Sequence, residues 1–106
     1  MNRVMVSFPE FARYLVKFAF ADIYAHEGTG LRAREQALVA ALTALGNAAP
    51  QKVHVHAAAH VGYSAREMAE ISMQTAVYAG CPAVLNGLPV AREACVDLGI
   101  TLYVEA

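Results

Sequence analysis

Cysteine and charge are both scarce in this sequence. Its 106 residues include two cysteines, Cys81 and Cys95, which are too few to crosslink a small secreted domain and too far apart to form a CxxC site. Charged residues make up 16% of the chain and the formal net charge is -1, so there is no basic stripe to bind a phosphate backbone. We therefore expect free, mostly buried thiols and no binding to nucleic acid.

Long hydrophobic runs are also absent. Hydrophobic residues form 58% of the sequence, but the uncharged apolar runs fall well short of the roughly 20 residues that a membrane-spanning helix needs. The N-terminal sequence MNRVMVSFPEF has no extended apolar core followed by a small-residue cleavage site, so it does not resemble a secretory signal. These observations predict a cytoplasmic protein without a membrane partner.

The hydrophobic content is high for a chain of this length. The 106 residues fit one domain, residues 1–106, because domains usually contain about 100 to 200 residues. A domain this small has a large surface relative to its volume, so some of its apolar side chains must stay outside the core. We expect that surplus to be buried between subunits of a homo-oligomer.

Helical periodicity runs through most of the chain and predicts an all-α fold of about five helices. The expected helices span about 8–24, 32–45, 47–61, 64–79 and 82–98. Capping boxes are predicted at Ser7 with Glu10 and at Ser64 with Glu67, because each serine precedes a glutamate by three residues. Pro89 predicts a kink or a division into two short helices, and the β-prone tail 100–104 is expected to lie extended.

Three of the four histidines lie close together, at His54, His56 and His60. His56 and His60 are four residues apart and share a helix face, but no third ligand and no HExxH glutamate accompanies them. We therefore expect no metal and no cofactor. His54 faces elsewhere, and Glu35 on the preceding helix is a candidate partner for proton transfer, although such a pair is also compatible with a simple ion pair or with two separate surface residues.

Two blocks of sequence resemble the carboxymuconolactone decarboxylase family, and the resemblance covers residues 18–98. The longer block reads HVHAAAHVGYSAREMAEISMQTAVYAGCPAVLNGLPVAREA, in which His54 stands eight residues before Gly62 and Tyr78 begins a Tyr-Ala-Gly-x-Pro-Ala motif. The shorter block, GLRAREQALVAALTALG, carries Arg34 and Glu35. The resemblance implies an all-α domain like alkyl hydroperoxidase D, assembled as a trimer or hexamer, with a substrate pocket that includes His26, Arg34 and Tyr78.

The family has a decarboxylase branch and a branch similar to alkyl hydroperoxidase D. Glu35 and His54 match the proton-relay residues of the latter, but its CxxC cysteines would fall at Asn47 and Pro50, which cannot supply a thiolate. Cys81 could replace that nucleophile only if the helix dipole lowered its pKa; a packing role is the simpler interpretation. His26 stands where the decarboxylases usually carry an arginine. An arginine can bind a substrate carboxylate through two parallel hydrogen bonds, and a histidine cannot.

These residues predict a cofactor-independent lyase of the decarboxylase type that acts by proton transfer on a small carboxylated lactone or keto acid. His54 would be the general acid or base, and Glu35 would orient it. Two alternatives remain at this stage. One is an alkyl hydroperoxidase D-like peroxidase that lacks the CxxC pair, and the other is a non-catalytic family member that binds a small molecule.

Overall fold

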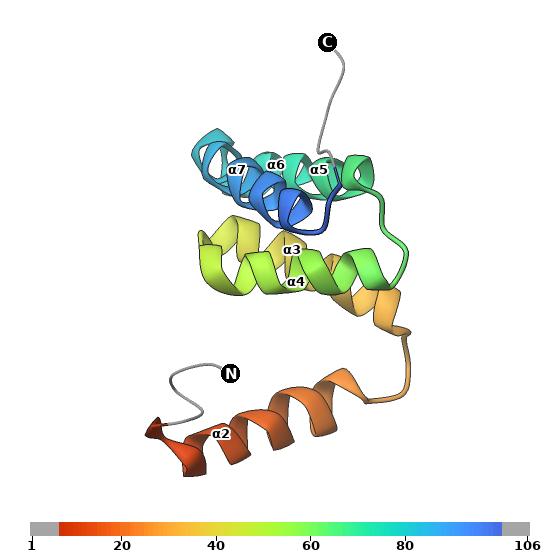
Figure 1. Ribbon diagram of the computed structural model, residues 1–106, viewed down its shortest axis with the longest axis vertical. Helices are drawn as coiled ribbons and strands as arrows, with labels where there is room; N and C mark the ends of the chain where they lie inside the picture. The colour runs from red at the N-terminus through yellow and green to blue at the C-terminus, as the bar shows by residue number, and fades with distance from the viewer. Residues whose placement is uncertain (1–6, 101–106) are drawn as a thin grey trace. The chain divides into compact units, whose positions relative to one another are not determined.

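The computed structural model describes residues 7–100, and the expected extended tail falls largely outside them, since residues 101–106 are not described. The described residues form helices and contain no strand, which confirms the all-α prediction. The elements are α2 (Pro9–Leu15), η1 (Val16–Tyr24), α3 (Leu31–Leu45), α4 (Ala48–His60), α5 (Ala65–Gln74), α6 (Ala76–Ala79) and α7 (Cys81–Asp97) (Figure 1). No helix within residues 7–100 is both long and apolar enough to cross a membrane.

The chain forms two compact units, residues 1–30 and 31–106. The first contains α2, which starts at Pro9 rather than at Phe8. Phe8 is the N-cap residue, with φ -132° and ψ 70°, and no side chain caps the helix. The predicted Ser7 capping box is therefore wrong. The reason is Pro9, because a proline disfavours helical geometry in the residue before it, and Phe8 does not occupy the first helical position that this box requires.

The second half of this helix, η1, is a π-helix, whereas the sequence predicted one α-helix as far as Tyr24. The amide of Ala25 bonds the carbonyl of Phe20, five residues earlier, at 3.0 Å. Apolar side chains occupy most positions of η1, so their spacing cannot distinguish 3.6 from 4.4 residues per turn. η1 has no buried residue, and Ala12 is the buried residue of α2.

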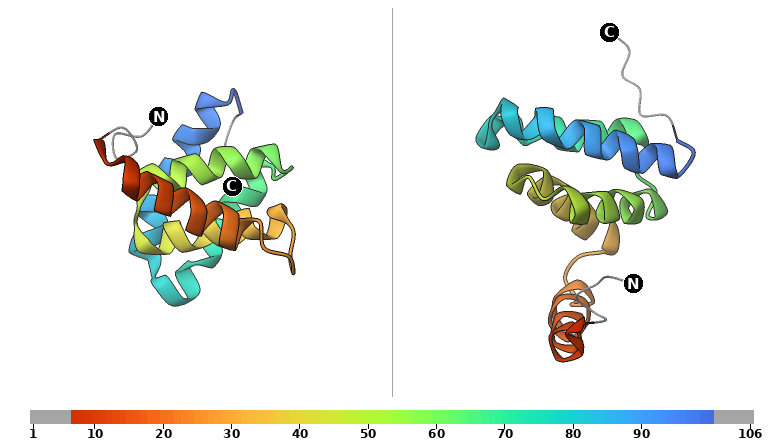
Figure 2. Two further views of the ribbon diagram at one scale, coloured as in Figure 1. Left: turned by 90° about the horizontal axis from the view of Figure 1, so that it is seen from below. Right: turned by 60° about the vertical axis from the view of Figure 1, so that its left-hand side comes forward.

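The second unit consists of two layers of helices, which Figures 1 and 2 show from different sides. One layer is the hairpin of α3 and α4, and the other contains α5, α6 and α7; α4 packs on α7 and α3 packs on α5. The core between them is lined mainly by Val39, Val55, Ala58, Tyr63, Ala65, Met68, Ala91, Ala94 and Cys95. Small alanines on α4 and α7 permit the helices to approach closely.

Helix ends in this unit follow local sequence signals. Gly46, Gly62 and Gly80 adopt positive φ at the ends of α3, α4 and α6, where a side chain would be strained. The predicted Ser64–Glu67 capping box is confirmed: the Glu67 amide donates to Ser64 Oγ at 3.0 Å, and the Ser64 amide donates to Glu67 Oε1 at 2.9 Å. The predicted helix 64–79 is interrupted only at Thr75, which separates α5 from α6.

Helix α7 is continuous through Pro89, so the predicted division into two short helices is wrong. A proline removes the amide that would bond the carbonyl four residues earlier, here that of Leu85. Both Pro89 and Leu85 are exposed in the chain, so water can bond the freed carbonyl. Packing of the opposite face, which buries Val84, Gly87, Ala91 and Ala94, compensates for the lost hydrogen bond.

Gly87 allows α7 to approach the α3–α4 hairpin closely. A Cβ at this position would lie 2.6 Å from Thr43 Cγ2, and Gln51 Nε2 donates a 2.9 Å hydrogen bond to the Gly87 carbonyl. We expect Gly87→Ala to lower the free energy of unfolding by about 1–3 kcal/mol, since overpacking outweighs the better helix propensity of alanine. Urea denaturation of the purified protein measures this change.

Two further variants test the cause of that loss. Gly30→Ala should be nearly neutral, because a Cβ there would meet no atom within 4 Å. Thr43→Ser removes the methyl group that the new Cβ would strike, so it should restore part of the stability of Gly87→Ala. If Gly87→Ala lowers the free energy of unfolding equally in the wild-type and the Thr43→Ser protein, the steric explanation is contradicted.

Candidate active site

Glu35 and His54 lie on opposite helices of the α3–α4 hairpin and contact each other directly. His54 Nδ1 is 2.9 Å from Glu35 Oε2. The Glu35 side chain is 1% exposed and the His54 side chain 21% exposed. The hairpin thus brings together two residues that are 19 positions apart, and it leaves the imidazole reachable while the carboxylate is buried.

The helix faces explain this geometry. Glu35, Val39 and Thr43 follow one another at intervals of four residues on α3, and all three are buried. On α4, His54 precedes the buried Val55 and therefore lies at the edge of the face that packs on the core. A carboxylate in such an apolar setting needs a charged or hydrogen-bonding partner, because an unpaired buried charge is strongly destabilising.

The contact determines which ring nitrogen is available for chemistry. An ionised carboxylate only accepts hydrogen bonds, so Nδ1 of His54 carries a proton when Glu35 is ionised. In the neutral imidazole Nε2 is then the basic nitrogen, and in the imidazolium Nε2–H is the acidic group that faces away from Glu35. The contact therefore holds the ring in one orientation, with Nε2 as the nitrogen that can take up or give a proton.

The other two histidines of the cluster do not join this pair. His56 Nε2 is 4.0 Å from Asp97 Oδ2 on α7, and His60 is exposed at the end of α4. Among residues 7–100, no group of three or more His, Cys, Asp or Glu side chains is arranged to hold a metal ion.

The predicted pocket residues occupy different places. Arg34 is partly buried on α3 beside Glu35, and His26 lies in the first unit, where its Nδ1 is close to the Glu27 carbonyl oxygen. Tyr78 is 100% exposed on α6, which packs on α5 and α7. In one chain Tyr78 therefore forms no wall of a cavity. The substrate-binding roles of these three residues stay predictions.

Both cysteines are free, as expected, but their environments differ. Cys95 is buried, and burial raises the pKa of its thiol. Cys81 is exposed at the first position of α7. The predicted burial and packing role are wrong for Cys81 in the single chain, because Cys81 and Leu85 lie on an exposed face of α7.

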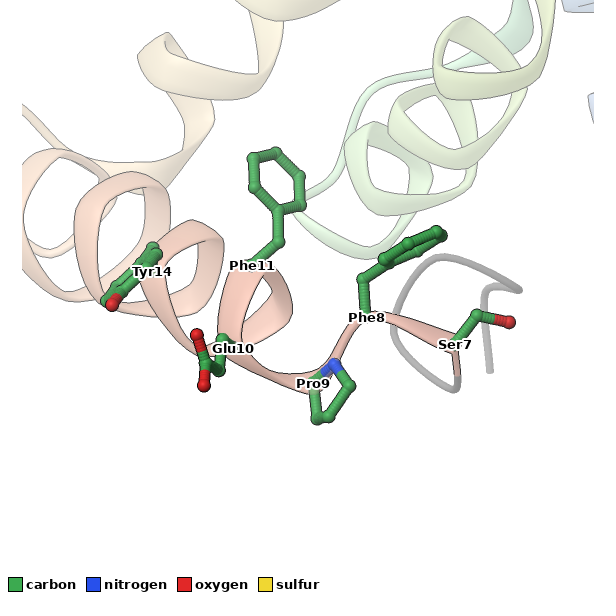
Figure 3. Close-up of a pocket in the computed structure, with 6 residues that line it drawn as sticks. All are labelled: Ser7, Phe8, Pro9, Glu10, Phe11 and Tyr14. Carbon is green, nitrogen blue, oxygen red and sulfur yellow. The ribbon is translucent and has the colours of Figure 1, made fainter.

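Two depressions lie along the N-terminal helix. One is lined by Ser7, Phe8, Pro9, Glu10, Phe11 and Tyr14, and Figure 3 shows Phe8 and Phe11 projecting from one side of α2. Another is lined by Pro9, Ala12, Arg13, Val16, Lys17 and Ala21. Neither lining contains an acid–base pair, so the depressions do not mark the site of proton transfer.

The sequence did not predict three polar residues that are buried within the second unit. Gln51, Thr43 and Ser72 are all essentially inaccessible, and Thr43 Oγ1 lies 3.3 Å from Ser72 Oγ. Thr43 also donates to the Val39 carbonyl, four residues back on its own helix, at 2.7 Å. Their only signal in the sequence is spacing, since Thr43 is eight residues after Glu35 and Gln51 three before His54.

Charged side chains also join α4 to α7. Lys52 Nζ lies 2.9 Å from Glu93 Oε1 and 2.8 Å from Asp97 Oδ2. Hydrogen bonds with Asp97 and then Glu93 raise the pKa of Lys52, and the hydrogen bond from Lys52 lowers the pKa of Asp97. The backbone hydrogen bond from Ser64 lowers the pKa of Glu67 in the same way. These contacts stabilise the second unit at neutral pH and lie outside the Glu35–His54 pair.

These lowered pKa values predict acid sensitivity. A carboxylate with a lowered folded-state pKa contributes stability above its unfolded pKa, and that stability is lost as the pH falls through the folded value. We expect the melting temperature to fall as the pH drops below the ordinary values of 4.5 for Glu67 and 3.8 for Asp97. Thermal melts across that range measure the effect. The Glu67→Gln/Asp97→Asn double variant should show a shallower fall, and identical acid dependence would contradict this assignment.

The fold and the pair together describe a small helical domain with a part-buried Glu–His pair on one hairpin. Residues 9–93 match the carboxymuconolactone decarboxylase family. The chain therefore belongs to the carboxymuconolactone decarboxylase family. It is also similar to the 4-carboxymuconolactone decarboxylase of Acinetobacter baylyi (strain ATCC 33305 / BD413 / ADP1), with 29% identity over 91 residues, 86% of this chain and 68% of that relative.

Proposed function

We propose that this protein is a cofactor-independent decarboxylase-like enzyme that acts on a small carboxylated lactone or keto acid. The observation that carries the proposal is the hydrogen bond of 2.9 Å between His54 Nδ1 and the buried Glu35 carboxylate. Membership of the family supports a decarboxylase-like role, and the relative from Acinetobacter carries that activity in its name. Glu35 and His54 supply acid–base chemistry without a metal.

In the proposed reaction the bond from carbon to the carboxylate breaks and carbon dioxide leaves. The electron pair stays on the substrate as an enolate, which the carbonyl of the lactone or keto acid delocalises. Nε2–H of the His54 imidazolium then gives its proton to the carbon. The ring, now neutral, keeps the proton on Nδ1, which stays hydrogen-bonded to the Glu35 carboxylate. Solvent returns one proton to Nε2 before the next turnover. The carboxylate of Glu35 stabilises the imidazolium and holds the ring in one orientation.

We further propose that the enzyme is one domain, residues 1–106, and that it works as a homo-oligomer, a trimer or hexamer. The family match supports the single domain, because it extends from α2 to α7. Exposed apolar side chains support the oligomer; they include Phe8, Phe11, Phe18, Val53, Val77, Tyr78 and Leu85. Association would cover this surface and could add His26 and Tyr78 to the substrate pocket.

The proposal is tested by incubating the protein with a panel of small carboxylated lactones and keto acids in deuterated water. Turnover should release carbon dioxide and place one solvent deuteron on the carbon that lost the carboxylate. If a compound binds but shows neither carbon dioxide release nor deuterium incorporation, and no other compound reacts, the non-catalytic, small-molecule-binding alternative becomes the better interpretation.

The peroxidase alternative has its own test, because Cys81 is exposed and free. Peroxide turnover with a dithiol reductant is expected to be absent. If turnover occurs and Cys81→Ser abolishes it while Cys95→Ser does not, a thiol mechanism replaces the decarboxylase proposal. The raised pKa of the buried Cys95 thiol makes that residue a suitable control.

A further inference from the structure

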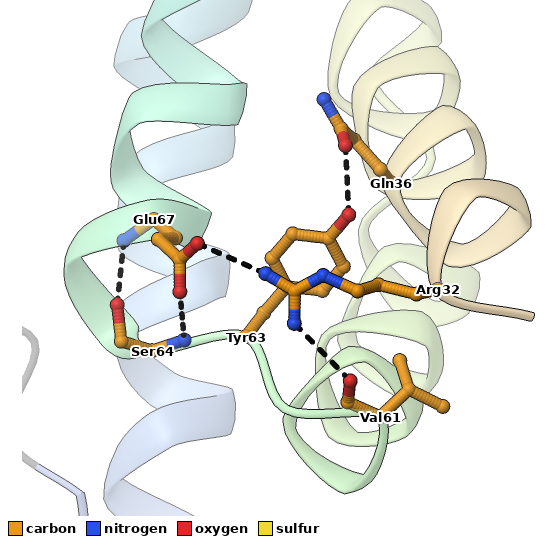
Figure 4. A network of polar contacts seen from close by, with 6 residues as sticks. All are labelled: Arg32, Gln36, Val61, Tyr63, Ser64 and Glu67. Carbon is orange, nitrogen blue, oxygen red and sulfur yellow. Dashed lines mark hydrogen bonds and ion pairs between the residues drawn. The ribbon is translucent and has the colours of Figure 1, made fainter.

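Arg32 holds the start of α3 to the turn between α4 and α5 (Figure 4). Its guanidinium lies 3.9 Å above the centre of the Tyr63 ring. Nη1 donates to the Val61 carbonyl at 3.3 Å, and Nη2 donates to Glu67 Oε2 at 3.1 Å. The Tyr63 hydroxyl donates to Gln36 Oε1 at 2.7 Å. We call Arg32, Gln36, Tyr63 and Glu67, with the Val61 carbonyl, the Arg32 clamp.

The clamp lies at the open end of the hairpin that carries the acid–base pair. Only Gly46 and Asn47 separate α3 from α4 at the closed end. At the other end Arg32 is three residues before Glu35 on α3, and Val61 is the C-cap of α4, seven residues after His54. Sliding one helix by a single turn moves its side chains by about 5.4 Å, which would break the 2.9 Å contact between Glu35 and His54.

Tyr63 anchors the clamp, whose Arg32 and Glu67 side chains are 51% and 47% exposed. Tyr63 is buried, although it belongs to a turn. Gly62 has φ +97°, which favours glycine, and a Cβ there would lie 3.1 Å from Arg32 Nη1, so the guanidinium packs close to this turn. Glu67, the acceptor for Nη2, is itself held by the capping box with Ser64. A lysine has no planar guanidinium, so it could not stack flat on the Tyr63 ring while it also donates to both the Val61 carbonyl and Glu67 Oε2.

We infer that the Arg32 clamp positions the Glu35–His54 pair by setting the register of α4 against α3. Arg32 is a positioning residue in this inference, since its guanidinium is engaged by Tyr63, Val61 and Glu67. The catalytic consequence rests on the proposed function, but the structural claim concerns the hydrogen bond of His54 and can be measured without a substrate. The clamp acts on the same two helices from their open end.

The test is nitrogen-15 NMR of the histidine rings in the full chain, for wild type, Arg32→Ala and Arg32→Lys. Wild type should show a His54 Nδ1–H resonance protected from exchange with water, assigned by its loss in His54→Ala. Arg32→Ala should lose that resonance, and Arg32→Lys should not restore it. Lys52→Met is the matched control, because it removes a cation that joins α4 to α7 rather than to α3; it should leave the resonance unchanged.

A folded Arg32→Ala protein with an unchanged His54 resonance would overturn the inference, as would equal loss in Lys52→Met. If Arg32→Ala does not fold, Glu67→Gln decides the matter: glutamine preserves a capping box but removes the charge that engages Nη2, so the resonance should weaken. On any substrate found active, Arg32→Ala should lower kcat with little change in KM. The two claims can fail separately. If Arg32→Ala loses the resonance but His54→Ala is fully active, the positioning role of the clamp stands and the proposed function is rejected.

Discussion

Replacing His54 with alanine is expected to lower kcat by about 10²- to 10⁴-fold on any substrate that the protein decarboxylates, the range that a positioned general acid or base contributes. The physical reason is the loss of Nε2, the proton donor for the enolate. KM should change less, because the imidazole acts mainly after carbon dioxide has left. Steady-state rates of carbon dioxide release on purified protein measure both constants, and circular dichroism verifies that the variant is folded.

His60→Ala is the matched control for this experiment. His60 lies on the same helix but is exposed at its end, so its removal should leave kcat within about twofold, as expected for a surface substitution away from the site. Activity of His54→Ala close to wild type would reject the proposed role of the imidazole. A similar loss in both variants would indicate a general effect on α4 instead of proton transfer by His54.

Glu35→Gln should have the second largest effect, a loss of about 10- to 100-fold in kcat. A hydrogen bond to a charged group is worth about 1.5–3 kcal/mol, and each 1.36 kcal/mol corresponds to a factor of ten in rate. Glutamine has nearly the same shape, so the packing of α3 is retained while the negative charge that stabilises the imidazolium is lost. The His54→Ala/Glu35→Gln double variant should be little worse than His54→Ala, because Glu35 acts through His54.

Glu70→Gln provides the control for charge removal. Glu70 is exposed on α5, where its Oε1 is 3.7 Å from Arg66 Nε, and pairs of this kind contribute little. It should leave kcat unchanged. If Glu35→Gln were also fully active, the buried carboxylate would have a structural role, and its contact with His54 would serve packing of the hairpin.

Local signals were sufficient for most helix boundaries and failed where two signals compete. Ser64 and Glu67 form the predicted capping box because each bonds the amide of the other within one turn. Ser7 and Glu10 have the same spacing, but Pro9 between them constrains Phe8 and shifts the start of α2. Pro89 broke no helix, since the packing of α7 on the hairpin outweighs one lost hydrogen bond.

The sequence predicted which residues form the candidate site, from their types and from the resemblance to a family, but not how they contact each other. Glu35 and His54 were named from those patterns, but the 2.9 Å between them depends on how α3 and α4 fold back on each other. The Arg32 clamp had no such pattern, because Arg32 and Glu67 are 35 positions apart. The exposure of Tyr78 was equally unpredictable from a motif.

The amino-acid sequence by itself determined the helical class, the ends of most helices and the family, because these depend on residues within one or two turns or on order along the chain. Only the tertiary structure decided that Glu35 is buried against His54, that Gly87 meets Thr43 and that Arg32 closes the hairpin. Those contacts join residues far apart in the chain, and their energies depend on distances and burial that exist only once the helices have packed.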